Sequence, residues 1–277
     1  MQFDLATLAP ALEQREPGLW FAREKPETIS YPAHGNAACL AVEDRSFWFR
    51  HRNAVIAEIA GRFHPRGIFL DVGGGNGFVA KALIAAGIDC VLVEPGVDGA
   101  LAARSRGVQP VICARLEDAN LPAGCAASIG LFDVLEHLED EAAALHLLHS
   151  LLQPSGRLFL TVPSYQFLFS SEDEAAGHFR RYTIPRLRRV LAASNFRVEF
   201  SSYVFAPLPP LIFLSRTLPT WLGMRHAKTH DLPVAEHTPG GPAAWAMDRM
   251  LNLELRRLRA GKPCPFGGSC LCVASRE

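Results

Sequence analysis

The sequence lacks an excess of charge of either sign, and this absence narrows the classes of function. Its 277 residues contain 28 Lys and Arg residues against 28 Asp and Glu residues. No basic field therefore points to nucleic acid as a partner. No uncharged stretch is long enough for a transmembrane helix. The first residues include Asp4 and lack the basic segment that opens a secretory signal. We expect a cytoplasmic protein.

The sequence also lacks a cysteine pattern that would indicate disulfides or a metal. Its seven cysteines are odd in number and several lie in apolar runs, so we expect reduced thiols in the core. The C-x5-C-x-C spacing of the last cysteines fits no structural zinc site. The residues considered for such a site are Cys264, Cys270, Cys272, His226, His230 and His237. We expect no bound metal.

The most informative segment is residues 68–78, where an apolar run leads to Asp71 and a turn with glycines at 73, 75 and 77. Glycine lets the backbone approach a ligand at distances that a Cβ would forbid. The G-x-G-x-G spacing differs from that of a dinucleotide-binding turn and from that of a phosphate loop. No lysine or hydroxyl follows to bind phosphate and magnesium. The turn therefore predicts a site for a ligand without phosphates.

Strands and helices alternate from this segment onward. Apolar or alternating runs predict seven strands, at residues 68–72, 90–93, 108–113, 128–132, 157–162, 196–200 and 270–274. Helical periodicity predicts a helix over 140–152 and another that begins at Thr183. This alternation predicts an α/β domain over residues 65–277 with a doubly wound, mostly parallel seven-stranded sheet. Such sheets bind ligands at the carboxyl ends of their strands.

Two segments lie outside this alternation. Residues 1–64 predict an irregular lead-in and a helix over 44–62 that would form an N-terminal helical lid. Residues 204–262 form an insertion before the last strand, with an apolar, proline-containing part over 204–222 and a helix over 243–259. We interpret the apolar part as a cap over the substrate. A surface for a lipid-like substrate or a peripheral membrane contact, and a partner interface, are the alternatives. Its prolines argue against one continuous helix.

Two carboxylates follow neighbouring predicted strands. Glu94 ends the second strand, where a carboxylate can accept hydrogen bonds from a ribose diol. A solvated loop acid is the alternative. Glu117 lies just past the third strand and could accept a hydrogen bond from the exocyclic amine of a base. Helix capping or solvation is the alternative there. The two acids therefore predict that the ligand contains a nucleoside.

The fourth predicted strand runs into the motif G-L-F-D-V-L-E-H-L at residues 130–138. With the glycine turn, the acid after the second strand and E-x-x-x-L-P at residues 117–122, it resembles the class I S-adenosylmethionine-dependent methyltransferases. The resemblance covers residues 71–204 and is to a branch that methylates small molecules and quinones at oxygen. It implies a Rossmann-like methyltransferase fold with S-adenosyl-L-methionine as the cofactor.

The resemblance also implies roles for single residues. The turn would hold the methionine and ribose part of the cofactor, Glu94 the ribose hydroxyls, and Glu117 with the Leu116 backbone the adenine. Two residues at the end of the fourth strand would border the cofactor. The full set of implied cofactor-binding residues is Asp71, Gly73, Gly75, Gly77, Glu94, Leu116, Glu117, Phe132 and Asp133.

A hydroxyl acceptor needs a base to take its proton. His137 is one candidate, and a contact with the backbone or with Glu136 is the alternative. His178 is the second and better placed candidate, within an acidic and basic stretch over residues 170–183. This stretch is similar to one that closes over the substrate in many relatives, so Arg181 and Tyr182 are candidate substrate residues. A self-paired, solvated charged loop is the alternative.

The aromatic residues of the N-terminal helix are further candidates, because such helices often cover the donor pocket in this fold. Trp48 could line the acceptor site, and packing of an amphipathic helix is the alternative. The expected function is methyl transfer to a small molecule, lipid-like or aromatic, at oxygen. A non-catalytic cofactor-binding or regulatory protein is a second hypothesis. A nicotinamide-dependent oxidoreductase is a third, disfavoured by the glycine spacing.

Overall fold

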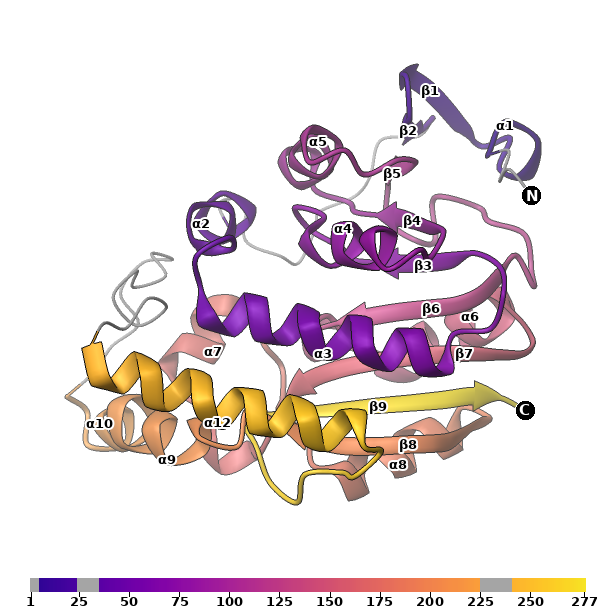
Figure 1. Ribbon diagram of the computed structural model, residues 1–277. Coiled ribbons are helices and arrows are strands. Elements are labelled where there is room, and N and C mark those ends of the chain that lie inside the picture. Colours follow the sequence, from indigo (N-terminus) through magenta and orange to yellow (C-terminus); the bar gives the residue numbers. More distant parts are fainter. Residues whose placement is uncertain (1–4, 24–34, 225–240) are drawn as a thin grey trace.

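The computed structural model describes residues 5–23, 35–224 and 241–277 and contains one mixed β-sheet with helices on both faces (Figure 1). The strands are β1 (Leu12–Glu16), β2 (Leu19–Ala22), β3 (Phe69–Val72), β4 (Cys90–Val93), β5 (Val111–Cys113), β6 (Ala126–Phe132), β7 (Leu152–Pro163), β8 (Phe196–Val204) and β9 (Ser269–Arg276). Their order across the sheet is β1-β2-β5-β4-β3-β6-β7-β9-β8. The predicted doubly wound α/β fold is confirmed.

All seven predicted strands are present, but the described part of the chain has nine strands rather than seven. The two further strands, β1 and β2, form an antiparallel hairpin within the lead-in that was expected to be irregular. The hairpin joins the sheet because β2 pairs in parallel with β5, with Leu19 opposite Val111. β9 is antiparallel to both of its neighbours, β7 and β8.

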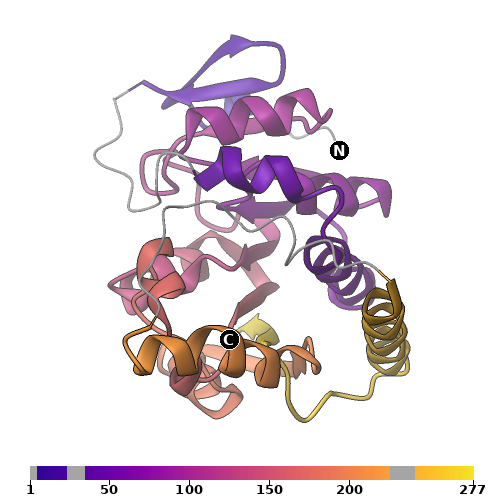
Figure 2. The same ribbon diagram turned by 90° about the vertical axis from the view of Figure 1, so that its left-hand side faces the viewer.

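The helices are α1 (Leu5–Leu8), α2 (Gly35–Val42), α3 (Phe47–Phe63), α4 (Phe78–Ala85), α5 (Val97–Ser105), α6 (Glu141–Leu151), α7 (Ser171–Ala176), α8 (Ile184–Ala193), α9 (Leu208–Ile212), α10 (Leu218–Trp221) and α12 (Gly241–Arg259). Helices α3, α4, α5 and α12 pack on one face of the sheet, while α6 and α8 pack on the other. Figure 2 shows α3 and α12 side by side. Both faces of the central strands are therefore covered, as their continuous apolar sequences require.

The helix starts are set by side-chain caps. Ser46, two residues after the expected Asp44, accepts hydrogen bonds from the backbone N–H groups of Trp48 and Phe49. Asp140 caps α6 in the same way, at distances of 3.1 and 2.9 Å. Thr183 caps α8, as the sequence predicts. Each cap satisfies N–H groups that have no partner within the helix.

The apolar segment after β8 is more regular than expected. α9, a π-helical turn (Phe213–Thr217) and α10 follow one another without a break. Two of the prolines lie in the first turn of α9, where a missing N–H costs nothing. Residues 208–221 are thus helical, but in three short elements rather than in one continuous α-helix.

The structure also tests the expectations for the cysteines and for membrane-spanning helices. Five cysteines are buried free thiols, Cys90, Cys113, Cys264, Cys270 and Cys272, as expected for core residues. Within the described ranges, no helix combines the length and the apolar character that crossing a membrane requires. The histidines considered with Cys264 for zinc lie outside the described residues.

Candidate functional site

The site lies where the strand order reverses, at the carboxyl end of β3 between β4 and β6. The following turn has positive φ at Gly73, Gly75 and Gly77, of 69°, 52° and 75°. A Cβ at Gly73 would lie 2.7 Å from Val134. A Cβ at Gly75 would have only Asn36 nearby, at 3.6 Å. The first glycine is thus required by packing, and Gly75 borders the space above the sheet.

Glu94 faces this turn from the end of β4. Its Oε2 accepts a hydrogen bond of 2.9 Å from the Gly75 N–H, and its Oε1 accepts one of 2.8 Å from the Gly96 N–H. Burial raises the pKa of the Glu94 carboxyl, and these two N–H groups oppose the rise. The alternative of a solvated loop acid is therefore wrong, because the side chain is buried and held against the glycine turn.

Asn36 is a site residue that the sequence analysis missed. It lies on α2, and its Nδ2 donates to Glu94 Oε1 at 3.3 Å. Its backbone oxygen accepts a hydrogen bond of 2.8 Å from Asn76, which also donates to Glu43 at 3.1 Å. Helix α2 is thus fixed over the glycine turn. No sequence signal marked Asn36, because its partner Glu94 lies 58 positions away.

Asp71 is buried beneath the turn and only 1% exposed. Among the described residues, neither of its carboxylate oxygens forms a hydrogen bond of normal geometry, although the Ala80 N–H is close enough to lower its pKa. Burial raises the pKa of Asp71 to about 7; the charge of Arg52 opposes this rise and that of Glu94 adds to it. Asp71 is thus poised to respond to a cationic ligand above it, because a nearby positive charge favours the carboxylate form.

The end of β6 is joined to helix α3. Asp133 has a φ of 59°, and its Oδ2 accepts a hydrogen bond of 2.7 Å from Arg52 Nη1. The same guanidinium lies 4.8 Å from the ring of Trp48. Trp48 in turn stacks on Phe205, with 5.5 Å between the ring centroids. Its observed role is therefore the packing of helix α3. Phe132 is buried and stacks on Phe69, hence its side chain belongs to the core.

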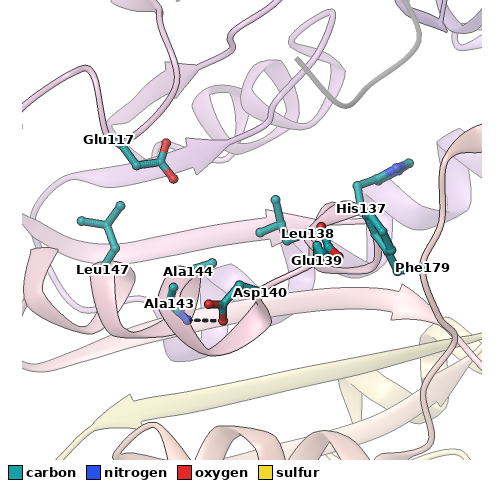
Figure 3. A pocket seen from close by; sticks show the side chains of 9 residues that line it. All are labelled: Glu117, His137, Leu138, Glu139, Asp140, Ala143, Ala144, Leu147 and Phe179. Carbon is teal, nitrogen blue, oxygen red and sulfur yellow. Dashed lines mark hydrogen bonds between the residues drawn. The ribbon is translucent and has the colours of Figure 1, made fainter. Parts of the chain in front are cut away.

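A cleft of about 560 Å³ opens beside these strand ends (Figure 3). Glu117 lies at one end of it, and His137 and Phe179 lie at the other. Leu116 packs partly buried against the core, beside the exposed Glu117. The cleft thus brings together two residues that the sequence predicted for different roles. Its lining residues are Glu117, His137, Leu138, Glu139, Asp140, Ala143, Ala144, Leu147 and Phe179.

The two histidine candidates lie against each other next to Glu136. The ring centroids of His137 and His178 are 4.6 Å apart. Burial, and then the charge of His178, lowers the pKa of His137 to about 4. Burial raises the pKa of Glu136 well above its usual range, and the nearby Asp133 adds to the rise. The structure therefore joins two histidines that are 41 positions apart in the sequence.

Asp173, on α7, orients His178. Its Oδ1 lies 2.8 Å from His178 Nδ1. Burial alone would raise the pKa of Asp173, but the hydrogen bond from His178 and the charge of Arg181 lower it to about 2. The carboxylate is therefore ionised, and His178 Nδ1 carries the proton that joins them. From the sequence, Asp173 could be recognised only as part of an acidic cluster.

Arg181 and Tyr182 do not face the cleft. The guanidinium of Arg181 is buried and donates to both oxygens of Asp173, at 2.8 and 2.9 Å. Tyr182 is 0% exposed, and its hydroxyl donates to Glu141 at 2.5 Å. Both expectations of substrate contact are therefore corrected: one side chain is occupied by an ion pair and the other lies in the core.

Comparison with known proteins agrees with this geometry. Residues 45–200, more than half of the chain, match the sequence model of a methyltransferase domain. A protein of Mycolicibacterium smegmatis named as a probable S-adenosylmethionine-dependent methyltransferase is 25% identical over 179 residues, or 63% of this chain and 68% of that protein. The ubiquinone biosynthesis O-methyltransferase of Azotobacter vinelandii is 29% identical over 98 residues, or 33% of this chain and 42% of that protein.

Solved structures share the fold. An S-adenosylmethionine-dependent methyltransferase of Thermotoga maritima aligns with a TM-score of 0.56 and 16% identity, covering 90% of this chain and 100% of that one. Phosphoethanolamine N-methyltransferase 2 of Haemonchus contortus, in complex with S-adenosyl-L-methionine, aligns with a TM-score of 0.54 and 15% identity, over 90% of this chain and 58% of that one.

Proposed function

The chain belongs to the methyltransferase domain family and is an S-adenosylmethionine-dependent enzyme, and from this premise we propose that it methylates an oxygen atom of a small molecule. The observation that carries the proposal is the pairing of Glu94 with the Gly75 N–H at the carboxyl edge of the sheet. A carboxylate beside a glycine turn is suited to a nucleoside with free ribose hydroxyls and no phosphate.

In the proposed complex, Glu94 accepts hydrogen bonds from the ribose hydroxyls, and the Asn36 amide gives way to them. Glu117 and the Leu116 backbone hold the adenine. The turn from Gly73 to Gly77 borders the methionine part, and the Asp71 carboxylate lies beneath it. Phe132 shapes the floor from within the core, while Asp133, held by Arg52, borders the donor.

The reaction is an in-line displacement at the methyl carbon. A bond forms between the acceptor oxygen and the methyl carbon, the carbon–sulfur bond breaks, and the sulfur keeps the electron pair. The hydroxyl proton must leave the acceptor. His137 lies at one end of the cleft and contacts His178, and we assign this pair to the release of the proton. The remaining task of the protein is alignment and exclusion of water.

Two observations support an apolar or aromatic acceptor with a hydroxyl group. One named relative is an O-methyltransferase of ubiquinone biosynthesis, although this chain spans less than half of its length. Large apolar side chains are also exposed over residues 208–222 and on α12, namely Leu211, Leu214, Trp221, Leu222, Trp245 and Leu253. Exposed side chains of this kind are suited to a lipid-like acceptor or to a membrane interface that holds one.

The test is turnover of methyl-labelled S-adenosylmethionine against a panel of acceptors. The panel contains phenols, catechols and quinols with and without an apolar tail, together with matched amines. We expect label in a hydroxylated aromatic and more of it when the tail is present. Label in amines alone would contradict transfer to oxygen. Donor binding without transfer to any acceptor would favour a non-catalytic role.

A further inference from the structure

Glu136, His137 and His178 form a cluster with the composition of a metal site. One ligand atom from each side chain lies within 4.8 Å of the other two. The residues come from separate parts of the chain: two from the helical turn after β6 (Leu135–His137), and one from the loop after α7. Two imidazoles and a carboxylate are donors that Zn²⁺ and other divalent transition metals prefer.

Glu136 is the residue of this cluster whose burial and free oxygen point to a ligand. It is 1% exposed, and its Oε2 has no hydrogen-bond partner in the part of the chain that the structure describes. Arg181, whose charge acts on Glu136, is already paired with Asp173. A buried carboxyl without a partner stays protonated, and a divalent cation beside it would stabilise the carboxylate form that binds a metal. A divalent cation at this position would supply the compensating charge.

Asp173 supplies the second feature of a metal centre. Histidine ligands in such sites usually donate their other ring N–H to a carboxylate, which fixes the tautomer and the ring orientation. His178 does this through Nδ1, at 2.8 Å from Asp173. In the neutral ring with this proton on Nδ1, Nε2 has the lone pair that a metal needs. Asp173 is itself held in place by Arg181 and by the Ser170 N–H, at 2.9 Å.

We propose that Glu136, His137 and His178 bind one divalent transition-metal ion, with Asp173 as the residue that positions His178. This departs from the sequence-based expectation of no metal, which considered other residues. An ion with bonds of about 2.1 Å requires its ligand atoms to be no more than about 4.2 Å apart. The histidines, both partly exposed, must therefore turn slightly toward Glu136 when the ion binds.

The position of the site suggests what the ion does. Three protein ligands leave at least one coordination position open, and His137 lines the cleft (Figure 3). This step rests on the proposed function: an acceptor hydroxyl bound to the ion loses its proton to solvent more readily, because a metal lowers the pKa of a bound oxygen. The acceptor would then enter the displacement as an oxyanion. The two histidines would then promote the loss of this proton as ligands of the ion.

The test is direct metal binding by the full-length protein. Wild-type protein stripped with a chelator is dialysed against Co²⁺, and bound metal is compared with that of Glu136→Gln and His178→Ala. The control is His146→Ala, which removes an exposed histidine of α6 outside the cluster. We expect each cluster variant to hold one equivalent less Co²⁺ than wild type, and the control to match wild type. Equal binding by wild type and Glu136→Gln overturns the proposal.

A second readout uses wild-type protein alone, so that it does not depend on the folding of a variant. Bound Co²⁺ with two imidazole ligands and fewer than six donors absorbs visible light more strongly than the hydrated ion. We expect such a band, and a spectrum like that of the hydrated ion overturns the site. Binding of S-adenosylhomocysteine by Glu136→Gln is measured in parallel. If Glu136→Gln still binds S-adenosylhomocysteine but no longer binds Co²⁺, the metal site is supported separately from the donor site. The proposed function is tested by turnover, which is a different measurement.

Discussion

Arg52 Nη1 lies 2.7 Å from Asp133 Oδ2, and this ion pair joins helix α3 to the end of strand β6. Both side chains are largely shielded from solvent, with 13% and 18% exposure. The guanidinium also lies over the rings of Trp48 and Phe49. One side chain therefore fixes the helix that covers the site to the strand end that forms its floor.

Replacing Arg52 by alanine should lower the free energy of unfolding by about 1–3 kcal/mol, because Asp133 loses its charged partner in a poorly solvated position. Chemical denaturation measures this change. Arg259→Ala is the matched control, since it breaks the exposed pair of Arg259 with Glu58 on the same helix α3. Exposed pairs contribute about 0–1 kcal/mol. Equal losses in the two variants would show that the Arg52 pair has no special role.

Asp71 should make stability depend on pH. Its pKa is about 7 in the folded chain, compared with 3.8 for the ordinary group. Between these values the folded state holds a proton that the unfolded state has released, so stability falls as pH rises through this window. Asp71→Asn removes this dependence. The free energy of unfolding of the variant minus that of wild type should therefore rise with pH from about 4. The total rise should be on the order of 4 kcal/mol above pH 7.

Denaturation of wild type and Asp71→Asn at several pH values from 4 to 8 measures this difference. Asp98→Asn is the control, because Asp98 is an exposed acid at the start of α5. Its difference from wild type should stay flat over the same range. A flat difference for Asp71→Asn as well would mean that Asp71 is ionised throughout, contrary to its buried environment.

Asn36 should compete with the donor. Its amide donates to Glu94, the carboxylate that we assign to the ribose hydroxyls. Asn36→Ala removes a hydrogen bond that must otherwise break on binding, with a net value of about 0.5–1.5 kcal/mol. We expect S-adenosylhomocysteine to bind about 2- to 10-fold more tightly to the variant, measured by calorimetry. Asn252→Ala, an exposed position on α12, should leave affinity unchanged. Weaker binding by Asn36→Ala would show that Asn36 holds the donor instead.

The sequence predicted the central sheet well because its strands are short apolar runs that end in acids or glycines. It missed the β1–β2 hairpin for the opposite reason. Four of the five residues of β1 are exposed, so the strand has no apolar face to recognise. The hairpin is held by the pairing of β2 with β5, at a sequence distance that no local pattern records.

The same limit applies to the site. Glycine spacing and the acid that follows a strand are local features, so Gly75 and Glu94 could be found together. The partners of Arg181 could not be found in this way, because whether a charged loop binds a substrate or folds on itself depends on burial. In the structure Asp173 is 2% exposed and takes both histidine and arginine as partners.

The central claim is that Glu94 holds the ribose of the donor, and calorimetric titration of Glu94→Gln with S-adenosylhomocysteine tests it most directly. The substitution keeps the shape of the side chain but removes its charge and one acceptor oxygen. Glu174→Gln, at an exposed position of α7, is the control. We expect affinity to fall by about 1–3 kcal/mol, or roughly 5- to 150-fold, in Glu94→Gln alone. Unchanged affinity in Glu94→Gln would contradict the assignment of the donor to this edge of the sheet.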